Sequence, residues 1–165
     1  MERLLRQGLG WLLKCEVLIA VVALVSVAVA LVADVVGREI LGSGLFGSQR
    51  YAVFNNAIAG LLGFAIVVHV GGHLRVSVVD KLFPGEWQVP MRRVGDALSA
   101  CICAYFAYFA ADFVAKTRAV GDVDPVLGIK IWIVQLVLPY IFVASAVRYI
   151  SFACYPALRP AEGDV

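Results

Sequence analysis

Long runs of hydrophobic residues alternate with short polar segments along this chain of 165 residues. A helix needs about 20 mostly apolar residues to cross the hydrocarbon core of a bilayer. Because backbone groups in lipid must form their hydrogen bonds within their own segment, runs of this length predict helices. Four runs qualify, at about residues 17–36, 52–72, 95–115 and 131–152. The pattern predicts an all-α membrane protein with four transmembrane helices.

The composition agrees with this fold class. Hydrophobic residues make up 62% of the chain and charged residues 16%, and the mean hydropathy is +0.89. A soluble domain is nearer half apolar and a quarter charged. The net charge of +2 is too small to indicate nucleic-acid binding. We expect residues 1–165 to form a single membrane domain.

The distribution of Lys and Arg predicts the orientation, because cytoplasmic loops carry an excess of these residues. The two tails and the second loop hold nine of them: Arg3, Arg6, Lys14, Arg75, Lys81, Arg92, Arg93, Arg148 and Arg159. The first and third loops hold five: Arg38, Arg50, Lys116, Arg118 and Lys130. This bias predicts that both termini are cytoplasmic. The first run exceeds the 7–15 residues of a signal-peptide core, so we expect it to be retained as a span.

Two segments outside the spans have the pattern of amphipathic helices that lie in the plane of the membrane interface. In the segment 73–94, Leu74, Val78 and Leu82 fall on one helical stripe, and Pro84 ends the pattern. Residues 1–16 carry a similar stripe. We expect short interfacial helices in both segments and a C-terminal tail over residues 153–165.

Five residues are predicted to anchor the chain at the membrane interface. Tryptophan favours the headgroup level of the bilayer. The predicted orientation puts Trp11 and Trp87 near the inner interface, together with His73 and Arg75 at the inner end of the second span, and it puts Trp132 near the outer interface.

Two pairs of opposite charges are spaced one helical turn apart. Asp34 and Arg38 lie near the outer end of the first span, and Asp112 and Lys116 repeat the arrangement on the third. An i,i+4 spacing brings a carboxylate and a cationic group together on one helix face. We expect ion pairs at the membrane interface, with an anchor for a partner protein as the alternative.

The second span carries residues that favour contact with another helix. An amide in hydrocarbon faces a neighbouring helix and bonds there, and glycine permits close backbone approach. Asn55, Asn56, Gly60 and Gly63 supply these groups and are candidates for a partner interface. The sequence does not say whether the neighbouring helix belongs to this chain or to another.

Catalytic and metal-binding motifs are missing from the sequence. The four cysteines form no C-x-x-C pair, and His69 and His73 alone make a poor metal site. We expect no catalytic residue, no cofactor and no metal in this chain. Pro139 is the one candidate helix break, and nothing mirrors it in the other half as a transporter's own site would require. An accessory subunit fits better than a self-sufficient transporter.

Three motifs in a fixed order then resemble one family. The first helix ends in DVVGREIL, with Arg38 at the motif's arginine. GGHLRV follows over residues 71–76, and DPVLGIKIW over 124–132, with Pro139 at the usual interval after it. The pattern is similar to that of the small membrane subunit of tripartite ATP-independent periplasmic (TRAP) transporters.

The chain departs from the family pattern at the outer side. Gln49 and Arg50 occupy positions that are often acidic in the family, and Lys130 replaces a proline. The Asp that often follows the GGHLRV motif is Ser77 here. These changes indicate partner surfaces of different charge.

The resemblance implies a non-catalytic role in the bacterial inner membrane. A large membrane subunit would carry the substrate and sodium sites, and a periplasmic solute-binding protein would deliver an organic anion, often a carboxylate. The small subunit would extend the static scaffold against which the large subunit moves. Arg38, Arg50 and Lys130 are then candidates for contact with the binding protein. The alternatives are a haem-anchoring subunit of an electron-transfer complex and a small self-sufficient channel.

Overall fold

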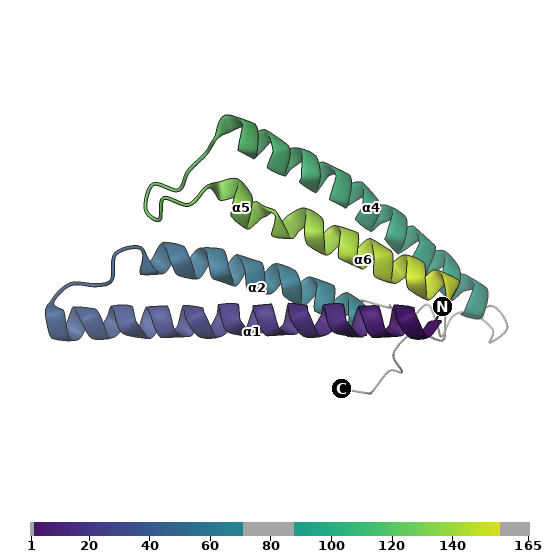
Figure 1. Cartoon of the computed structure of the whole chain (residues 1–165), viewed down its shortest axis with the longest axis horizontal. Helices are drawn as coiled ribbons and strands as arrows, with labels where there is room; N and C mark the ends of the chain where they lie inside the picture. Colours follow the sequence, from purple (N-terminus) through teal and green to yellow (C-terminus); the bar gives the residue numbers. More distant parts are fainter. Residues whose placement is uncertain (1, 71–87, 156–165) are drawn as a thin grey trace.

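The computed structural model describes the backbone of residues 2–70 and 88–155, and the side chains of residues 7–69 and 93–155. Five helices follow in chain order (Figure 1): α1 (Glu2–Leu41), α2 (Ser48–Val70), α4 (Gln88–Val120), α5 (Ile131–Gln135) and α6 (Val137–Cys154). Within the described residues the only extended pairing is an isolated bridge between Val123 and Lys130. The all-α prediction is confirmed.

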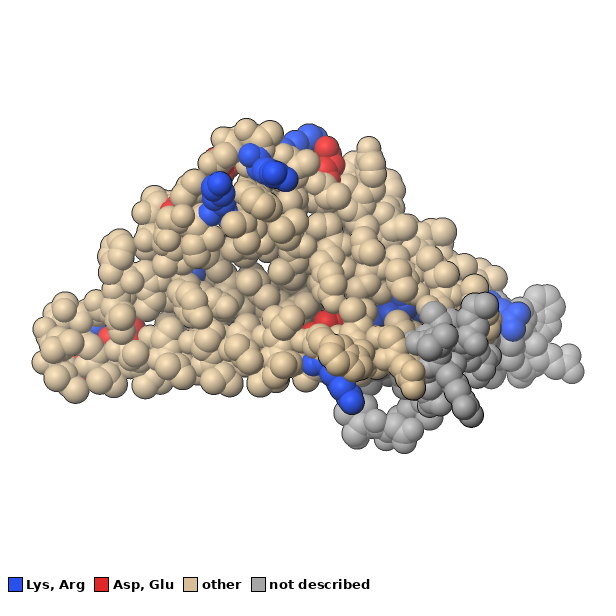
Figure 2. Space-filling model, in the orientation of Figure 1, with Lys and Arg blue, Asp and Glu red and all other residues tan. Residues whose placement is uncertain are grey.

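Four stretches of helix are long and apolar enough to cross a membrane: Gln7–Leu41, Ser48–His69, Arg93–Val120 and Ile131–Cys154. Their number and order agree with the four predicted spans. Figure 2 shows charged side chains as small islands on a surface that is otherwise uncharged. A surface of this kind is suited to lipid and to membrane-embedded partners.

The helices are arranged as a fan (Figure 1). Helix α1 packs on α2, α2 on α6, and α6 on α4, so α1 and α4 form the two edges. The fan is closed at the end where α1 begins and α6 ends, and it spreads toward the α1–α2 turn and the α4–α5 loop. The structure therefore has two edge helices whose outer sides touch no other described helix.

The boundaries of α1 and α4 differ from the expected division into spans and interfacial helices. Helix α1 runs without interruption through residues 2–16, where we expected a separate interfacial helix. Helix α4 begins at Gln88, so the end of the expected interfacial segment 73–94 belongs to α4. No proline interrupts residues 2–16, and the apolar stripe continues into the first span, which explains the single helix. The anchors His73, Arg75 and Trp87 lie outside the described residues.

The predicted break in the fourth span is confirmed. Pro139 has no backbone N–H to donate to the carbonyl of Gln135, four residues earlier. The helix is interrupted at Leu136, whose N–H is shared between the carbonyls of Trp132, at 3.1 Å, and Ile133, at 3.4 Å. The fourth span is thus a short α5 followed by α6.

Small side chains set the close packing of the inner helices. Ala59, Leu62 and Ala65 face inward along α2, and Ala65 is fully buried. A second cluster joins α2, α4 and α6 through Val68, Ala100, Cys103, Ala146 and Tyr149. Close approach of helix backbones supplies the dispersion contacts that hold helices together in lipid.

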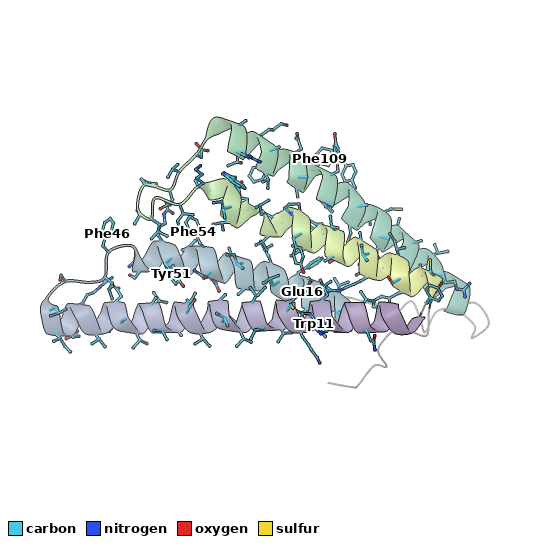
Figure 3. All side chains as sticks on the ribbon, viewed as in Figure 1. Trp11, Glu16, Phe46, Tyr51, Phe54 and Phe109 are labelled. Carbon is cyan, nitrogen blue, oxygen red and sulfur yellow. The ribbon has the colours of Figure 1, made fainter. Side chains whose placement is uncertain are left out.

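A buried ion pair joins the two ends of the chain. Glu16 of α1 and Arg148 of α6 are 1% and 0% exposed, and Arg148 Nη2 donates to Glu16 Oε2 at 2.5 Å. Arg148 Nη1 donates to the carbonyl of Ala65 at 2.6 Å, and the Tyr140 hydroxyl donates to Glu16 Oε1 at 2.9 Å. Figure 3 shows Glu16 directed into the space between the helices. This network holds α1, α2 and α6 together at the closed end of the fan.

The ion pair corrects the sequence interpretation. Arg148 was counted among the positive charges that face the cytoplasm, but it is buried and neutralised by Glu16. Without Arg148, eight Lys and Arg residues remain on the side predicted to be cytoplasmic and five on the other. The predicted orientation is therefore unchanged. Glu16 was not recognised as a candidate, although it and Arg148 are opposite charges at the inner ends of two spans. Matching the depths of such charges would have identified the pair.

We predict that the Glu16 and Arg148 side chains are strongly coupled in stability. Removing one partner of a buried ion pair costs about 3–5 kcal/mol, whereas replacing both with apolar residues is often nearly neutral. E16L or R148L alone should therefore lower the thermal unfolding midpoint in detergent far more than the double variant E16L/R148L. A double variant that loses the sum of the two single losses would show that the charges act independently.

Candidate partner-binding surfaces

The outer end of α1 is tied to the turn that follows it. Arg38 Nη2 donates to Asp34 Oδ2 at 2.5 Å, which confirms the predicted i,i+4 pair, and Asp34 is buried. The turn passes so close that a Cβ at Gly44 would lie 2.6 Å from Asp34 Oδ1 and 2.7 Å from Arg38 Nε. A side chain at residue 44 would therefore displace the Asp34–Arg38 pair.

A second ion pair connects the start of α2 to the α4–α5 loop. Arg50 Nε lies 3.0 Å from Asp124 Oδ2, and the Asp124 side chain is 3% exposed. The other carboxylate oxygen accepts the backbone N–H groups of Leu127, at 2.9 Å, and Val126, at 3.0 Å. These bonds, the N–H of Leu127 first, hold the pKa of the Asp124 carboxyl below its ordinary value of 3.8, with the Arg50 guanidinium contributing and burial opposing. The Nε group of Arg50 is therefore used in a contact within the chain, and the side chain is still half exposed.

The DPVLGIKIW segment is a compact loop built around Asp124. The N–H of Asp124 donates to the carbonyl of Ile129, and the N–H of Gly128 donates to the carbonyl of Asp124, both at 2.9 Å. Gly128 has a φ of +66°, which glycine adopts without strain. The motif therefore encodes a folded loop between α4 and α5, and the exposed Lys130 ends it.

Two of the predicted interface residues of α2, Asn56 and Gly60, are exposed, whereas Asn55 and Gly63 are half-buried. The Asn55 side chain donates to the carbonyl of Tyr51 in its own helix, at 3.0 Å, and Asn56 is exposed. A Cβ built at Gly60 or at Gly63 would meet nothing within 4 Å. The contact of α2 with α1 and α6 is centred on its alanine-rich face, and Asn56 and Gly60 lie away from that face. The predicted residues stay candidates for a partner from another chain.

The two edges of the fan carry different side chains. The outer side of α1 is aliphatic, with exposed residues such as Leu18, Val22 and Val25. The side of α4 that faces away from α6 carries Tyr105 and Tyr108, which are 62% and 71% exposed. The α1 edge is suited to lipid, whereas the α4 edge presents hydroxyl groups within a membrane-spanning helix.

The α4 edge is a connected aromatic surface. The ring of Phe109 lies 4.7 Å from that of Tyr105 and 5.4 Å from that of Tyr108, centroid to centroid. Figure 3 shows Phe109 directed away from α6. One turn further, Lys116 Nζ lies 2.6 Å from Asp112 Oδ2, which confirms the second predicted pair. The sequence predicted this pair but did not single out the tyrosines. In a helix that is apolar on most sides, the sequence does not show which side packs on other helices and which is exposed.

The tryptophan anchors that the structure describes lie near opposite ends of the fan. Trp11 is 74% exposed near the start of α1. Trp132 lies in α5 under the Arg118 guanidinium, whose carbon is 5.0 Å from the ring centroid. Their role at the membrane interface stays a prediction. Among residues 7–69 and 93–155, no three His, Cys, Asp or Glu side chains are grouped as metal ligands would be.

The fold and these surfaces define a multi-pass membrane protein whose exposed polar groups suit protein partners. The chain matches the DctQ component of tripartite ATP-independent periplasmic transporters over residues 27–158. It is also similar to the ectoine TRAP transporter small permease protein TeaB of Halomonas elongata, with 25% identity over 143 residues, which cover 85% of this chain and 72% of TeaB. The chain belongs to the DctQ family of TRAP transporter components.

We predict that the outer loop loses its order in acid through Asp124. Because the pKa of Asp124 in the folded protein lies below its ordinary value of 3.8, the ionised carboxylate stabilises the loop above that pH, and this contribution is lost as the pH falls through the lowered pKa. Hydrogen exchange at the Val126 and Leu127 amides, normalised to intrinsic rates, should show this loss of protection. D124A, which has no acceptor at this position, should lack the protection at every pH, whereas the neighbouring D122A should lose it with pH as the unaltered chain does. Protection in D124A equal to that of the unaltered chain would contradict the assignment.

Proposed function

We propose that this protein is the non-catalytic small subunit that extends the static scaffold of a sodium-coupled TRAP transporter. The substrate and sodium sites are placed in the large membrane subunit, and a periplasmic binding protein delivers an organic anion, with a carboxylate as the expected class. Membership of the DctQ family supports the role of a transporter component. The name of TeaB assigns that relative to ectoine transport.

The observation that carries the scaffold role is the contrast between the two edges of the fan. Tyr105 and Tyr108 lie near the middle of the span Arg93–Val120, where lipid offers no hydrogen-bond acceptor. Tyrosine is enriched at the membrane–water interfaces, where its hydroxyl is hydrated. A partner helix with a carbonyl or polar side chain at this depth would satisfy both hydroxyls. We therefore place the large subunit against the α4 edge and lipid against the α1 edge.

The rigid support of that edge fits a static role. Helix α4 packs along α6, and α6 is bound to α1 and α2 through Arg148. A load on the α4 edge would therefore be shared by every helix of the fan. Membership of a family of transporter components favours this role over the haem-anchoring alternative.

We predict that a tagged chain co-purifies with a much larger polytopic membrane subunit. The double variant Y105F/Y108F should reduce the recovered partner by roughly three- to tenfold, because interhelical hydrogen bonds in membranes contribute about 0.6 kcal/mol each on average, and up to about 1.7. It leaves the aromatic contacts in place. The matched variant Y51F, which removes a hydroxyl from α2, should leave recovery unchanged. Native mass spectrometry of the purified complex gives the ratio of the subunits.

The variant G60W tests the alternative docking face on α2. The chain itself leaves open space around Gly60, so the variant should fold, and any loss of partner would report a contact outside the chain. Loss with G60W together with normal recovery in Y105F/Y108F would move the interface to α2. Full transport activity of the lone chain in proteoliposomes would contradict the proposed role altogether.

A further inference from the structure

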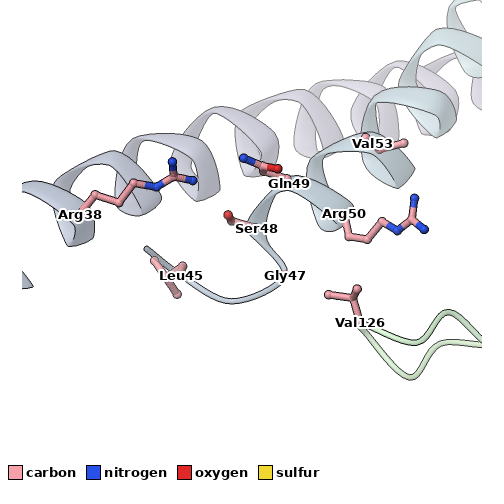
Figure 4. Close-up of a pocket in the computed structure, with 8 residues that line it drawn as sticks. All are labelled: Arg38, Leu45, Gly47, Ser48, Gln49, Arg50, Val53 and Val126. Carbon is pink, nitrogen blue, oxygen red and sulfur yellow. The ribbon is translucent and has the colours of Figure 1, made fainter. Parts of the chain in front are cut away.

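A pocket of about 590 Å³ lies beside the α1–α2 turn, near the α4–α5 loop. Figure 4 shows its polar residues spread along the turn, with Arg38 at one end and Arg50 at the other. Ser48 and Gln49 lie between them, and Leu45, Val53 and Val126 supply apolar lining. The pocket thus combines two cationic groups with an apolar wall.

The surface that the two arginines present is cationic although each has an acidic partner. The Arg38 and Arg50 side chains are 55% and 51% exposed, whereas those of Asp34 and Asp124 are 6% and 3% exposed. The carboxylates therefore lie behind the guanidinium groups and hold them in place. Guanidinium groups fixed in this way are suited to phosphate, which they bind through their remaining N–H donors.

The position of the pocket relative to the spans selects the source of that phosphate. Arg38 lies three residues before the end of the span Gln7–Leu41, and Arg50 lies two residues after the start of the span Ser48–His69. The 22 residues of Ser48–His69 extend over about 33 Å, close to the hydrocarbon thickness, so Arg50 near its start lies at the headgroup level. Val53, one turn deeper on α2, is 58% exposed, so an apolar path leads from the pocket toward the hydrocarbon.

We propose that this pocket binds an acidic phospholipid, with its phosphate held by Arg50, the charge of Arg38 at the other end of the pocket adding to the attraction, and an acyl chain leaving past Val53. A molecule with an anionic head and an apolar tail matches both parts of the lining. The carboxylate of a soluble partner would use the arginines but would leave the path past Val53 unoccupied. The site does not depend on the role in transport, because it uses residues of this chain alone.

Gln49 provides the decisive test because it lines the pocket without taking part in either ion pair. Q49E adds a negative charge between the arginines and leaves both buried carboxylates paired. Q7E adds the same charge at the other end of α1, where Gln7 is exposed, and serves as the matched control. The measurement is native mass spectrometry of the purified full chain titrated with phosphatidylglycerol or phosphatidylcholine.

The unaltered chain and Q7E should retain phosphatidylglycerol in preference to phosphatidylcholine, and Q49E should bind phosphatidylglycerol roughly tenfold more weakly, as one added charge within a few ångströms of the phosphate implies. R50Q should also weaken binding; should that variant fail to fold, Q49E still decides. Equal binding of the two lipids to the unaltered chain, or equal phosphatidylglycerol binding to Q49E and Q7E, would overturn the proposal. Loss of binding-protein-dependent uptake in Q49E with unchanged lipid binding would instead assign the pocket to a protein carboxylate.

Discussion

The Glu16–Arg148 ion pair is the constraint on which the arrangement of the helices depends. A charged side chain inside a membrane protein is expensive, so each of these residues needs the other in place. The pair joins α1 to α6, and the hydrogen bond from Arg148 to the Ala65 carbonyl joins α2 to both. Because Ala65 carries a single methyl group, its backbone is accessible to the guanidinium. One electrostatic requirement thus fixes the relative positions of three helices at the closed end of the fan.

At the open end, the connection is made through the α1–α2 turn and the α4–α5 loop. Arg50 holds the Asp124 loop against the start of α2, and Asp34 and Arg38 hold the α1–α2 turn. Each link uses a buried carboxylate with an exposed arginine. The outer surface is therefore structurally fixed while it still offers cationic groups to what lies outside.

Hydrophobic pattern and span length were sufficient to predict the number and order of the membrane helices, because the length of an apolar run depends on local sequence. The break at Pro139 and the two i,i+4 ion pairs were predictable for the same reason. The pairing of Arg50 with Asp124 was not predictable in this way, since these residues are far apart in sequence and meet through tertiary packing. Local sequence did not give the pairing of Glu16 with Arg148 either, and only a comparison of the depths of opposite charges on different spans would have indicated it. The exposed face of α4 could not be predicted from the sequence either, because hydrophobic periodicity is weak in a run that is apolar on most sides.

The α2 glycines show the same limit of prediction from sequence. Gly60 and Gly63 indicated close packing, yet the structure packs the alanine-rich face of α2 instead. Composition identified the helix that approaches another closely, but not the side on which it does so. Contacts with neighbouring helices decide this, and the sequence of a single helix does not give them.

The unbroken α1 has a mechanical consequence. Its 40 residues extend over about 60 Å, roughly twice the hydrocarbon thickness of a bilayer. Such a rod cannot be contained in the hydrocarbon by tilting within the usual range of 0–40°. Without a hinge, a change in membrane thickness would rotate α1 as a whole. Because Glu16 couples α1 to α6, the same rotation would reach the rest of the fan, and the subunit would respond to bilayer thickness as a single lever.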